Sequence, residues 1–310
     1  MKIRWKTQLC SSLILLSQSV MSAKLAIVID DFGYRKHNEE AILKLPTEIS
    51  IAILPDSPLR DEMANKAASQ GRDILIHLPM APISKQPLEK NTLTPQMSAQ
   101  EIERIIERAI AKIPQAKGMN NHMGSAMTSD LTAMKHVMQT LQHHQLFFLD
   151  SVTIGRTQAT QAASQTHVNV IKRNVFLDDS QKEADIERQF DRAVSIARKR
   201  GYAIAIGHPH PNTVRVLQRR IPLLPADVEL ASISSLAKGV PVSQWHATEI
   251  SSSSLHKRLK PCPIKVPGDL IIPSTPYLLW QTLKEKVTIT LMTNHQKSLE
   301  RQSAANTDTP

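Results

Sequence analysis

The chain has 310 residues, enough to bury a large core in one or two domains. Its formal net charge is +10, of which +3 lies in residues 1–23 and +3 in residues 241–310, so that only +4 is left on the body. This remaining charge is spread over segments of mixed sign, and aromatic residues make up only 4% of the chain. Nucleic-acid binding, which needs a basic surface and aromatic side chains for base stacking, is therefore not expected.

The N-terminus has the three parts of a secretory signal peptide. Basic residues occur within residues 1–6, a short apolar stretch covers residues 9–16, and small residues around Ala23 suit cleavage. The apolar stretch is too short to span a membrane comfortably. We expect residues 1–23 to be removed and the mature protein to be periplasmic or secreted, without a transmembrane segment. Cys262 is then the only cysteine left, which excludes an intramolecular disulfide.

From residue 24 to about residue 240, predicted strands and helices alternate as in a parallel α/β fold. The expected strands cover residues 25–29, 49–54, 74–76, 146–149, 174–177, 202–206 and 228–230. The expected helices cover residues 36–45, 58–70, 98–113, 130–143 and 182–200. The second helix is expected to begin at a cap on Asp56 or Ser57, and the third at a capping box of Ser98 and Glu101. Residues 117–125, rich in Gly and Asn, do not resemble a packing element, and residues 241–310 are expected to form a largely disordered tail.

Two adjacent carboxylates follow the first buried strand. Neighbouring side chains of an extended chain point to opposite sides, so Asp30 and Asp31 can share one cleft only if the chain turns there. Gly33 allows such a turn. Two carboxylates at the end of a buried strand require a cation or a proton to offset their charge. The alternative, a cap for the following helix, accounts for one aspartate but hardly for two.

Other predicted strands also end in residues that bind metals or move protons. These residues are His77, His122, Asp150, Asp178 and His208. The carboxyl ends of parallel strands form one face of a barrel, where active sites lie. One histidine after a strand is usually structural, but several at one face favour a divalent metal site, most simply zinc. A bound ion lowers the pKa of its water to about 7 and polarises a carbonyl, while a free carboxylate and a histidine move the protons.

Five segments together resemble the divergent polysaccharide deacetylase family, a branch of the NodB-like carbohydrate esterase superfamily. They are residues 29–33 (IDDFG), 77–80 (HLPM), 118–125 (GMNNHMGS), 148–151 (FLDS) and 207–209 (GHP). The resemblance implies a distorted (β/α) barrel of about seven parallel strands and metal-dependent removal of acetyl groups from a polysaccharide. It also implies that Asp30 is the general base, Asp31 and His77 are metal ligands, and His208 is the general acid.

The chain departs from the superfamily pattern at two places. Ala81 stands where the second motif has a further histidine, and we propose His122 as the ligand that replaces it. The arginine–proline third motif is absent from residues 118–125, so the substrate must be positioned differently. Asn120, Asn121 and Asp150 are the candidate substrate-binding residues.

Three functions are compatible with these features. The first is metal-dependent deacetylation of a cell-envelope or extracellular polysaccharide. The second is a non-catalytic periplasmic protein that binds a glycan or a partner through a degenerate deacetylase fold. The third is another metallohydrolase on the same barrel, such as a phosphoesterase, although few Lys or Arg residues lie near the strand ends to bind a phosphate.

Overall fold

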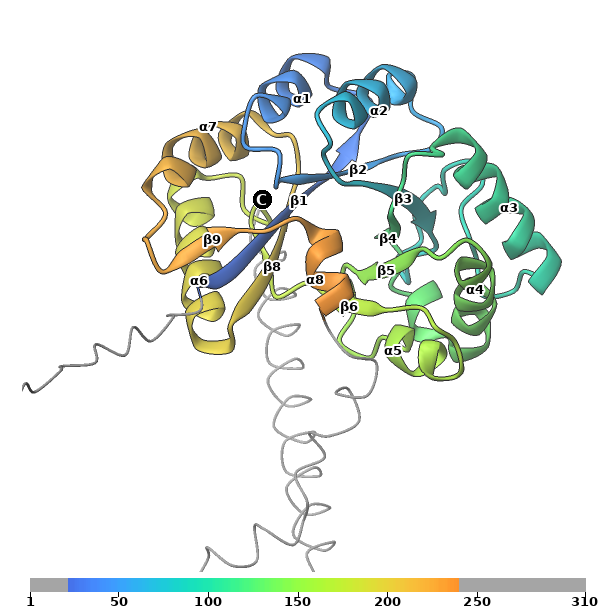
Figure 1. Cartoon of the computed structure of the whole chain (residues 1–310). Helices are drawn as coiled ribbons and strands as arrows, with labels where there is room; N and C mark the ends of the chain where they lie inside the picture. Colours follow the sequence, from blue (N-terminus) through green and yellow to red (C-terminus); the bar gives the residue numbers. More distant parts are fainter. Residues whose placement is uncertain (1–21, 240–310) are drawn as a thin grey trace, which may run out of the picture. The chain divides into compact units, whose positions relative to one another are not determined.

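The computed structural model describes residues 22–239, so most of the expected signal peptide and the expected tail lie outside the described residues. Parallel strands curl into a barrel with helices around it (Figure 1). The strands are β1 (Ala23–Phe32), β2 (Ser50–Ile53), β3 (Ile74–Met80), β4 (Gly118–Met123), β5 (Phe147–Asp150), β6 (Val170–Lys172), β7 (Val175–Phe176), β8 (Tyr202–Gly207) and β9 (Val228–Leu230). The helices are α1 (Lys36–Leu43), α2 (Arg60–Ser69), α3 (Ala99–Lys112), α4 (Leu131–His143), α5 (Ala159–Ala162), α6 (Glu183–Arg200), α7 (Pro211–Arg220) and α8 (Ile233–Gly239).

The sheet order is β6-β5-β4-β3-β2-β1-β8-β7, with β9 beside the first residues of β1. The barrel closes through β6 and β7, which are almost continuous in sequence. Arg173 N donates to Asp150 O of β5 (3.0 Å), and Asn174 N donates to Ile204 O of β8 (2.8 Å). Residues 170–176 therefore leave β5 and join β8. With β6 and β7 counted as one position and β9 set aside, the expected distorted barrel of about seven parallel strands is confirmed.

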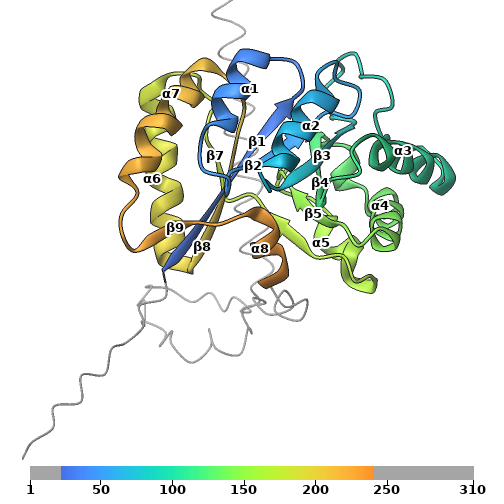
Figure 2. The same ribbon diagram turned by 45° about the horizontal axis from the view of Figure 1, so that its top comes forward.

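The strands carry apolar side chains on both faces, as their position between helices and barrel interior requires. On the outer face of β1, Ile27 and Ile29 belong to the same apolar cluster as Phe190 of α6. On the inner face, Ala26 and Val28 cluster with residues of β8 and of α8. Helix α8 lies within the ring of strands in both views (Figures 1 and 2). The interior is thus largely an apolar packed core. At its amino-terminal end, the buried side chains of Ser50 and Asp73 accept hydrogen bonds from the first backbone N–H groups of α8.

The main departure from the expected elements is β4, which occupies a central position in the sheet. Gly118 begins β4 because the Phe147 ring fills the place of a side chain: a Cβ there would lie 2.6 Å from the ring. Asn120 and Asn121 are buried within the strand. Strand β6 was also missed. The residues that looked unsuitable for packing are those that let β4 approach β5 and that direct the Asn120 amide to His77 and Asp30.

The helix boundaries follow the sequence in most places. The capping box of Ser98 and Glu101 is present, and Gly71 and Gly201 follow their helices in left-handed conformations. The cap expected at Asp56 or Ser57 is wrong, because α2 begins at Arg60 and the Ser57 hydroxyl donates to Leu54 O instead (2.7 Å). Between residues 22 and 239, no helix is both long and apolar enough to cross a membrane.

Candidate active site

A distortion at the end of β1 turns Asp30 and Asp31 toward the same place. The pairing of β1 with β2 changes register between Ile29 and Phe32, and Asp31 has a left-handed φ of 58°. Such a φ is strained for a residue other than glycine, and a bulge re-aims side chains in this way. As a result Asp31 Oδ1 and Asp30 Oδ2 lie 3.2 and 3.7 Å from the same nitrogen, His77 Nε2. The reorientation expected at Gly33 therefore begins two residues earlier.

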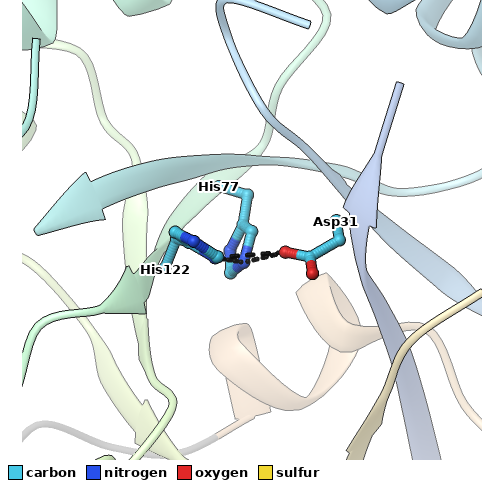
Figure 3. Close-up of side chains that lie close together, drawn as sticks. All are labelled: Asp31, His77 and His122. Carbon is cyan, nitrogen blue, oxygen red and sulfur yellow. Dashed lines mark hydrogen bonds and ion pairs between the residues drawn. The ribbon is translucent and has the colours of Figure 1, made fainter. Parts of the chain in front are cut away.

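Asp31, His77 and His122 converge from the carboxyl ends of β1, β3 and β4 (Figure 3). Asp31 Oδ1 lies 3.2 Å from His77 Nε2 and 3.1 Å from His122 Nδ1. The two nitrogens are 3.2 Å apart. The structure thus brings together the three residues that the sequence proposed as metal ligands, in a nearly equilateral triangle of ligand atoms.

The triangle has the size and chemistry of a divalent metal site. With metal–ligand bonds of about 2.0–2.2 Å and tetrahedral angles, neighbouring ligand atoms are about 3.3 Å apart. Asp31 Oδ1 is buried and accepts no hydrogen bond from any residue of the described chain, although two imidazole nitrogens are close to it. Three ligand atoms that face a common point in this way are what an ion requires. One carboxylate and two imidazoles fit zinc or a similar ion.

Asn120 sets the orientation of both His77 and Asp30. Its Nδ2 donates to Asp30 Oδ1 (2.9 Å), so its Oδ1 is the atom that faces His77 Nδ1 (2.8 Å). His77 Nδ1 must therefore carry a proton, and in the neutral ring the lone pair lies on Nε2, directed at the metal site. Hydrogen bonds of this kind fix the tautomer of metal-binding histidines. On His122 the nitrogen away from the site, Nε2, lies 3.4 Å from Glu89 Oε1.

The charges of the site shift three pKa values. Burial raises the pKa of Asp30, and the nearby histidines offset this only in part. Burial acts in the same direction on Asp31, but His122 and His77 outweigh it and hold the pKa of Asp31 far below its usual range. Burial disfavours the charged form of His77, yet Asp30 and Asp31 raise its pKa to about 9. In the metal-free protein at neutral pH, His77 thus carries the positive charge that an ion would replace.

His208 lies on the opposite side of the site, after β8. Its Nε2 is 3.9 Å from Asp31 Oδ2, and its Nδ1 is 3.0 Å from Asp178 Oδ1. Burial lowers the pKa of His208, but Asp178 and the site aspartates raise it overall. The sequence placed Asp178 at a strand end without a role; the structure shows that it orients His208. The position of Asp178 at a strand end was visible in the sequence, but no local pattern indicates which histidine Asp178 contacts.

Asp178, His208 and His210 form a second group of potential ligands. Asp178 is already bonded: Oδ2 accepts from the His208 backbone N–H and the Thr213 hydroxyl (both 2.7 Å), and Oδ1 contacts the His208 ring. This carboxylate has no free oxygen aimed at an ion. The geometry therefore favours one metal site and a positioned histidine over two metal sites.

The three candidate substrate-binding residues are buried, with at most 1% of each residue exposed: Asn120, Asn121 and Asp150. Asn120 bridges His77 and Asp30. Asn121 accepts from Ser151 N (2.9 Å) and donates to Met123 O (2.6 Å), which joins β4 to the loop after β5. Asp150 Oδ1 accepts from Val152 N (2.9 Å), within a turn in which Val152 has a φ of 50°. Asn120 therefore holds two site residues in place, whereas the hydrogen bonds of Asn121 and Asp150 involve the end of β4 and the loop that follows β5.

A family model for divergent polysaccharide deacetylases matches residues 27–237, a span that contains all of these site residues. The chain belongs to this family. This family member is similar to the uncharacterised protein YibQ of Escherichia coli (strain K12). The two are 62% identical over 226 residues, which cover 73% of this chain and 71% of YibQ. An uncharacterised Haemophilus influenzae protein is 47% identical over 220 residues, 71% of this chain and 79% of its own length.

Among solved structures, the crystal structure of the uncharacterised protein ATU2773 from Agrobacterium tumefaciens C58 resembles this family member. It matches with a TM-score of 0.65 and 22% identity, over 71% of this chain and 91% of that one. At this identity the likeness shows the fold alone, and it agrees with the barrel described above.

Proposed function

We propose that the protein is an exported, metal-dependent hydrolase that removes acetyl groups from an acetylated polysaccharide of the cell envelope or its surroundings. The observation that carries this proposal is the triangle of Asp31, His77 and His122, with a carboxylate outside it on one side and a histidine on the other. Membership of the deacetylase family supports the reaction class.

Asp31, His77 and His122 would hold the divalent ion, most simply zinc. When bound, the ion supplies electrostatic stabilisation to the acetyl carbonyl oxygen and lowers the pKa of a water molecule. Asp31 lies in the triangle through Oδ1, and the second imidazole nitrogens of the two histidines face Asn120 and Glu89. These contacts keep both rings directed at one point.

Asp30 is placed to act as the general base. Asn120 holds Oδ1, while Oδ2 faces the site and is free to accept the proton of the attacking water. Asp30 is 2% exposed, and the raised pKa of its carboxyl makes it a stronger base than an exposed aspartate.

His208 is placed to protonate the leaving nitrogen. Asp178 holds its Nδ1, so that Nε2 faces the site, and the carboxylates of Asp178, Asp30 and Asp31 raise the pKa of His208, which stabilises the protonated ring. Water adds to the acetyl carbonyl carbon, the C–N bond breaks, and acetate and a free amine leave. The proton taken by Asp30 and the proton given by His208 balance this hydrolysis.

Asp30→Asn tests the proposal because it keeps the shape of the side chain but removes the base. We expect acetate release from acetylated amino-sugar oligomers to fall by about 10²-fold or more, while the ion stays bound. Asp179→Asn, at an exposed position beside the site, is the matched control and should release acetate like the wild type.

Two outcomes would contradict the proposal. The first is unchanged acetate release by Asp30→Asn. The second is a zinc-loaded wild-type protein that binds glycan but releases no acetate, which would indicate the non-catalytic binding role instead.

A further inference from the structure

The loop after β1 is held in place by a buried carboxylate. Glu39 is 0% exposed, and its Oε1 accepts from the backbone N–H groups of Tyr34 (2.9 Å) and Arg35 (2.6 Å). The exposed side chains of Tyr34 and Arg35 are thus carried on a fixed backbone, four residues or fewer from Asp31.

Arg35 extends from this loop to the loop that follows β8. Its Nη1 lies 2.5 Å from His210 Nδ1, and Asn38 Nδ2 donates to Pro209 O in the same loop (2.9 Å). The His210 ring lies beside the ring of His208, with 5.6 Å between their centroids. The guanidinium of Arg35 therefore contacts the histidine that packs beside the proposed general acid.

Hydrogen-bond donors converge at this point. A guanidinium can only donate, so His210 Nδ1 accepts and its proton lies on Nε2. The side-chain amide of Gln181, from the loop before α6, lies 3.4 Å from that Nε2. The three side chains come from three different loops at the carboxyl end of the barrel.

The Arg35 guanidinium has no carboxylate partner in the described part of the chain, while Asp178 lies within 4.8 Å of a His210 nitrogen. Among residues 22–239, no acidic side chain lies within ion-pair distance of the Arg35 guanidinium. The two buried carboxylates nearby are engaged elsewhere: Asp178 bonds His208 and Thr213, and Glu39 bonds the loop backbone. The first turn of α7, which starts after His210, contains no acidic residue.

We propose that Arg35, His210 and Gln181 form a subsite for a carboxylate on the substrate, so that the protein acts on an acidic glycan. This inference rests on the proposed deacetylase function. A guanidinium offers a planar pair of N–H groups that matches a carboxylate in a bidentate arrangement. Because His210 packs beside His208, the carboxylate would belong to the acetylated sugar or its direct neighbour.

The test compares two acetylated oligosaccharides that differ only in one group, a carboxylate in one and its neutral amide in the other. We expect the wild type to have a KM about tenfold lower for the acidic oligosaccharide, with a similar kcat. Arg35→Ala should abolish this difference in KM, and Arg35→Lys should retain part of it. Arg104→Ala, at an exposed position on α3, should behave as the wild type.

Calorimetry of both oligosaccharides with the metal-loaded protein separates this inference from the proposed function. Tighter binding of the acidic oligosaccharide, lost in Arg35→Ala, supports the subsite even if no acetate is released. Equal binding of the two oligosaccharides by the wild type, or a preference that survives in Arg35→Ala, would overturn it, whether or not acetate is released.

Discussion

Asn120 is the residue on which the geometry of the site depends, and Asn120→Ala removes its hydrogen bonds to His77 and Asp30. The change leaves the His77 Nδ1–H and Asp30 Oδ1 buried without their partners. Each such group costs about 1–3 kcal/mol, so the free energy of unfolding should fall by about 2–6 kcal/mol. Because the His77 ring is no longer held, zinc affinity should fall by about 10- to 100-fold.

Urea unfolding of the metal-free protein measures the first effect, and competition with a chromophoric zinc chelator measures the second. Asn120→Asp separates them, since its carboxylate keeps an oxygen toward His77 but loses the donor to Asp30. Asn65→Ala, at an exposed position on α2, is the control. If Asn120→Ala binds zinc and unfolds like the wild type, Asn120 does not direct His77 Nε2 at the ion, and this part of the account is wrong.

Three further changes test other parts of the site. Binding of zinc near pH 7 should release about one proton per ion, because the ion displaces the proton from His77, whose pKa is about 9. Calorimetry in buffers of different ionisation enthalpy measures the number of protons released. A release of no protons would contradict this prediction. The raised pKa of His208 stabilises the fold below its unfolded pKa of about 6.5, and this contribution is lost as the pH rises through the folded value. Asp178→Asn should therefore destabilise the metal-free protein more at about pH 6 than at about pH 9.5; an equal loss in urea unfolding at both would refute the pairing. Gly33→Ala, whose Cβ would lie 1.8 Å from Ser57 Oγ at a φ of 117°, should lower the free energy of unfolding by about 2–4 kcal/mol. Gly155→Ala, with no atom within 4 Å, should not, and similar losses in both would refute the steric argument.

The strand ends could be predicted because their signal is local. Residues 25–29 are apolar and continuous, and the inward face of β1 continues from Ala26 and Val28 to Asp30 by the alternation of a strand. The same alternation leads from Leu75 to His77 and from Ile206 to His208. A buried strand that ends in a polar residue therefore indicated both the fold and the face of the barrel that carries the site.

Strand β4 could not be predicted because its stability comes from distant residues. Asn120 is 43 residues from His77 and 90 residues from Asp30, and hydrogen bonds to such distant partners make its burial favourable. Without them the segment resembles a polar loop. The same limit applies to Asp178, whose contact with His208 spans 30 residues.

The bulge at Asp31 also escaped prediction. The sequence indicated that a turn was needed near Gly33, but Asp31 itself adopts the left-handed conformation. Such strain is held by the surrounding structure, here the pairing of β1 with both β2 and β8, and no local composition reveals it.

The zinc content of the purified protein tests the triangle of Asp31, His77 and His122 most directly. The protein is loaded with zinc, free ions are removed, and the bound zinc is measured by inductively coupled plasma mass spectrometry. We expect one zinc ion per chain in the wild type, in Asp30→Asn and in His208→Ala, and loss of the ion in His77→Ala and His122→Ala. A wild-type protein without zinc, or variants of His77 and His122 that retain it, would contradict the metal centre and the hydrolysis proposed to occur there.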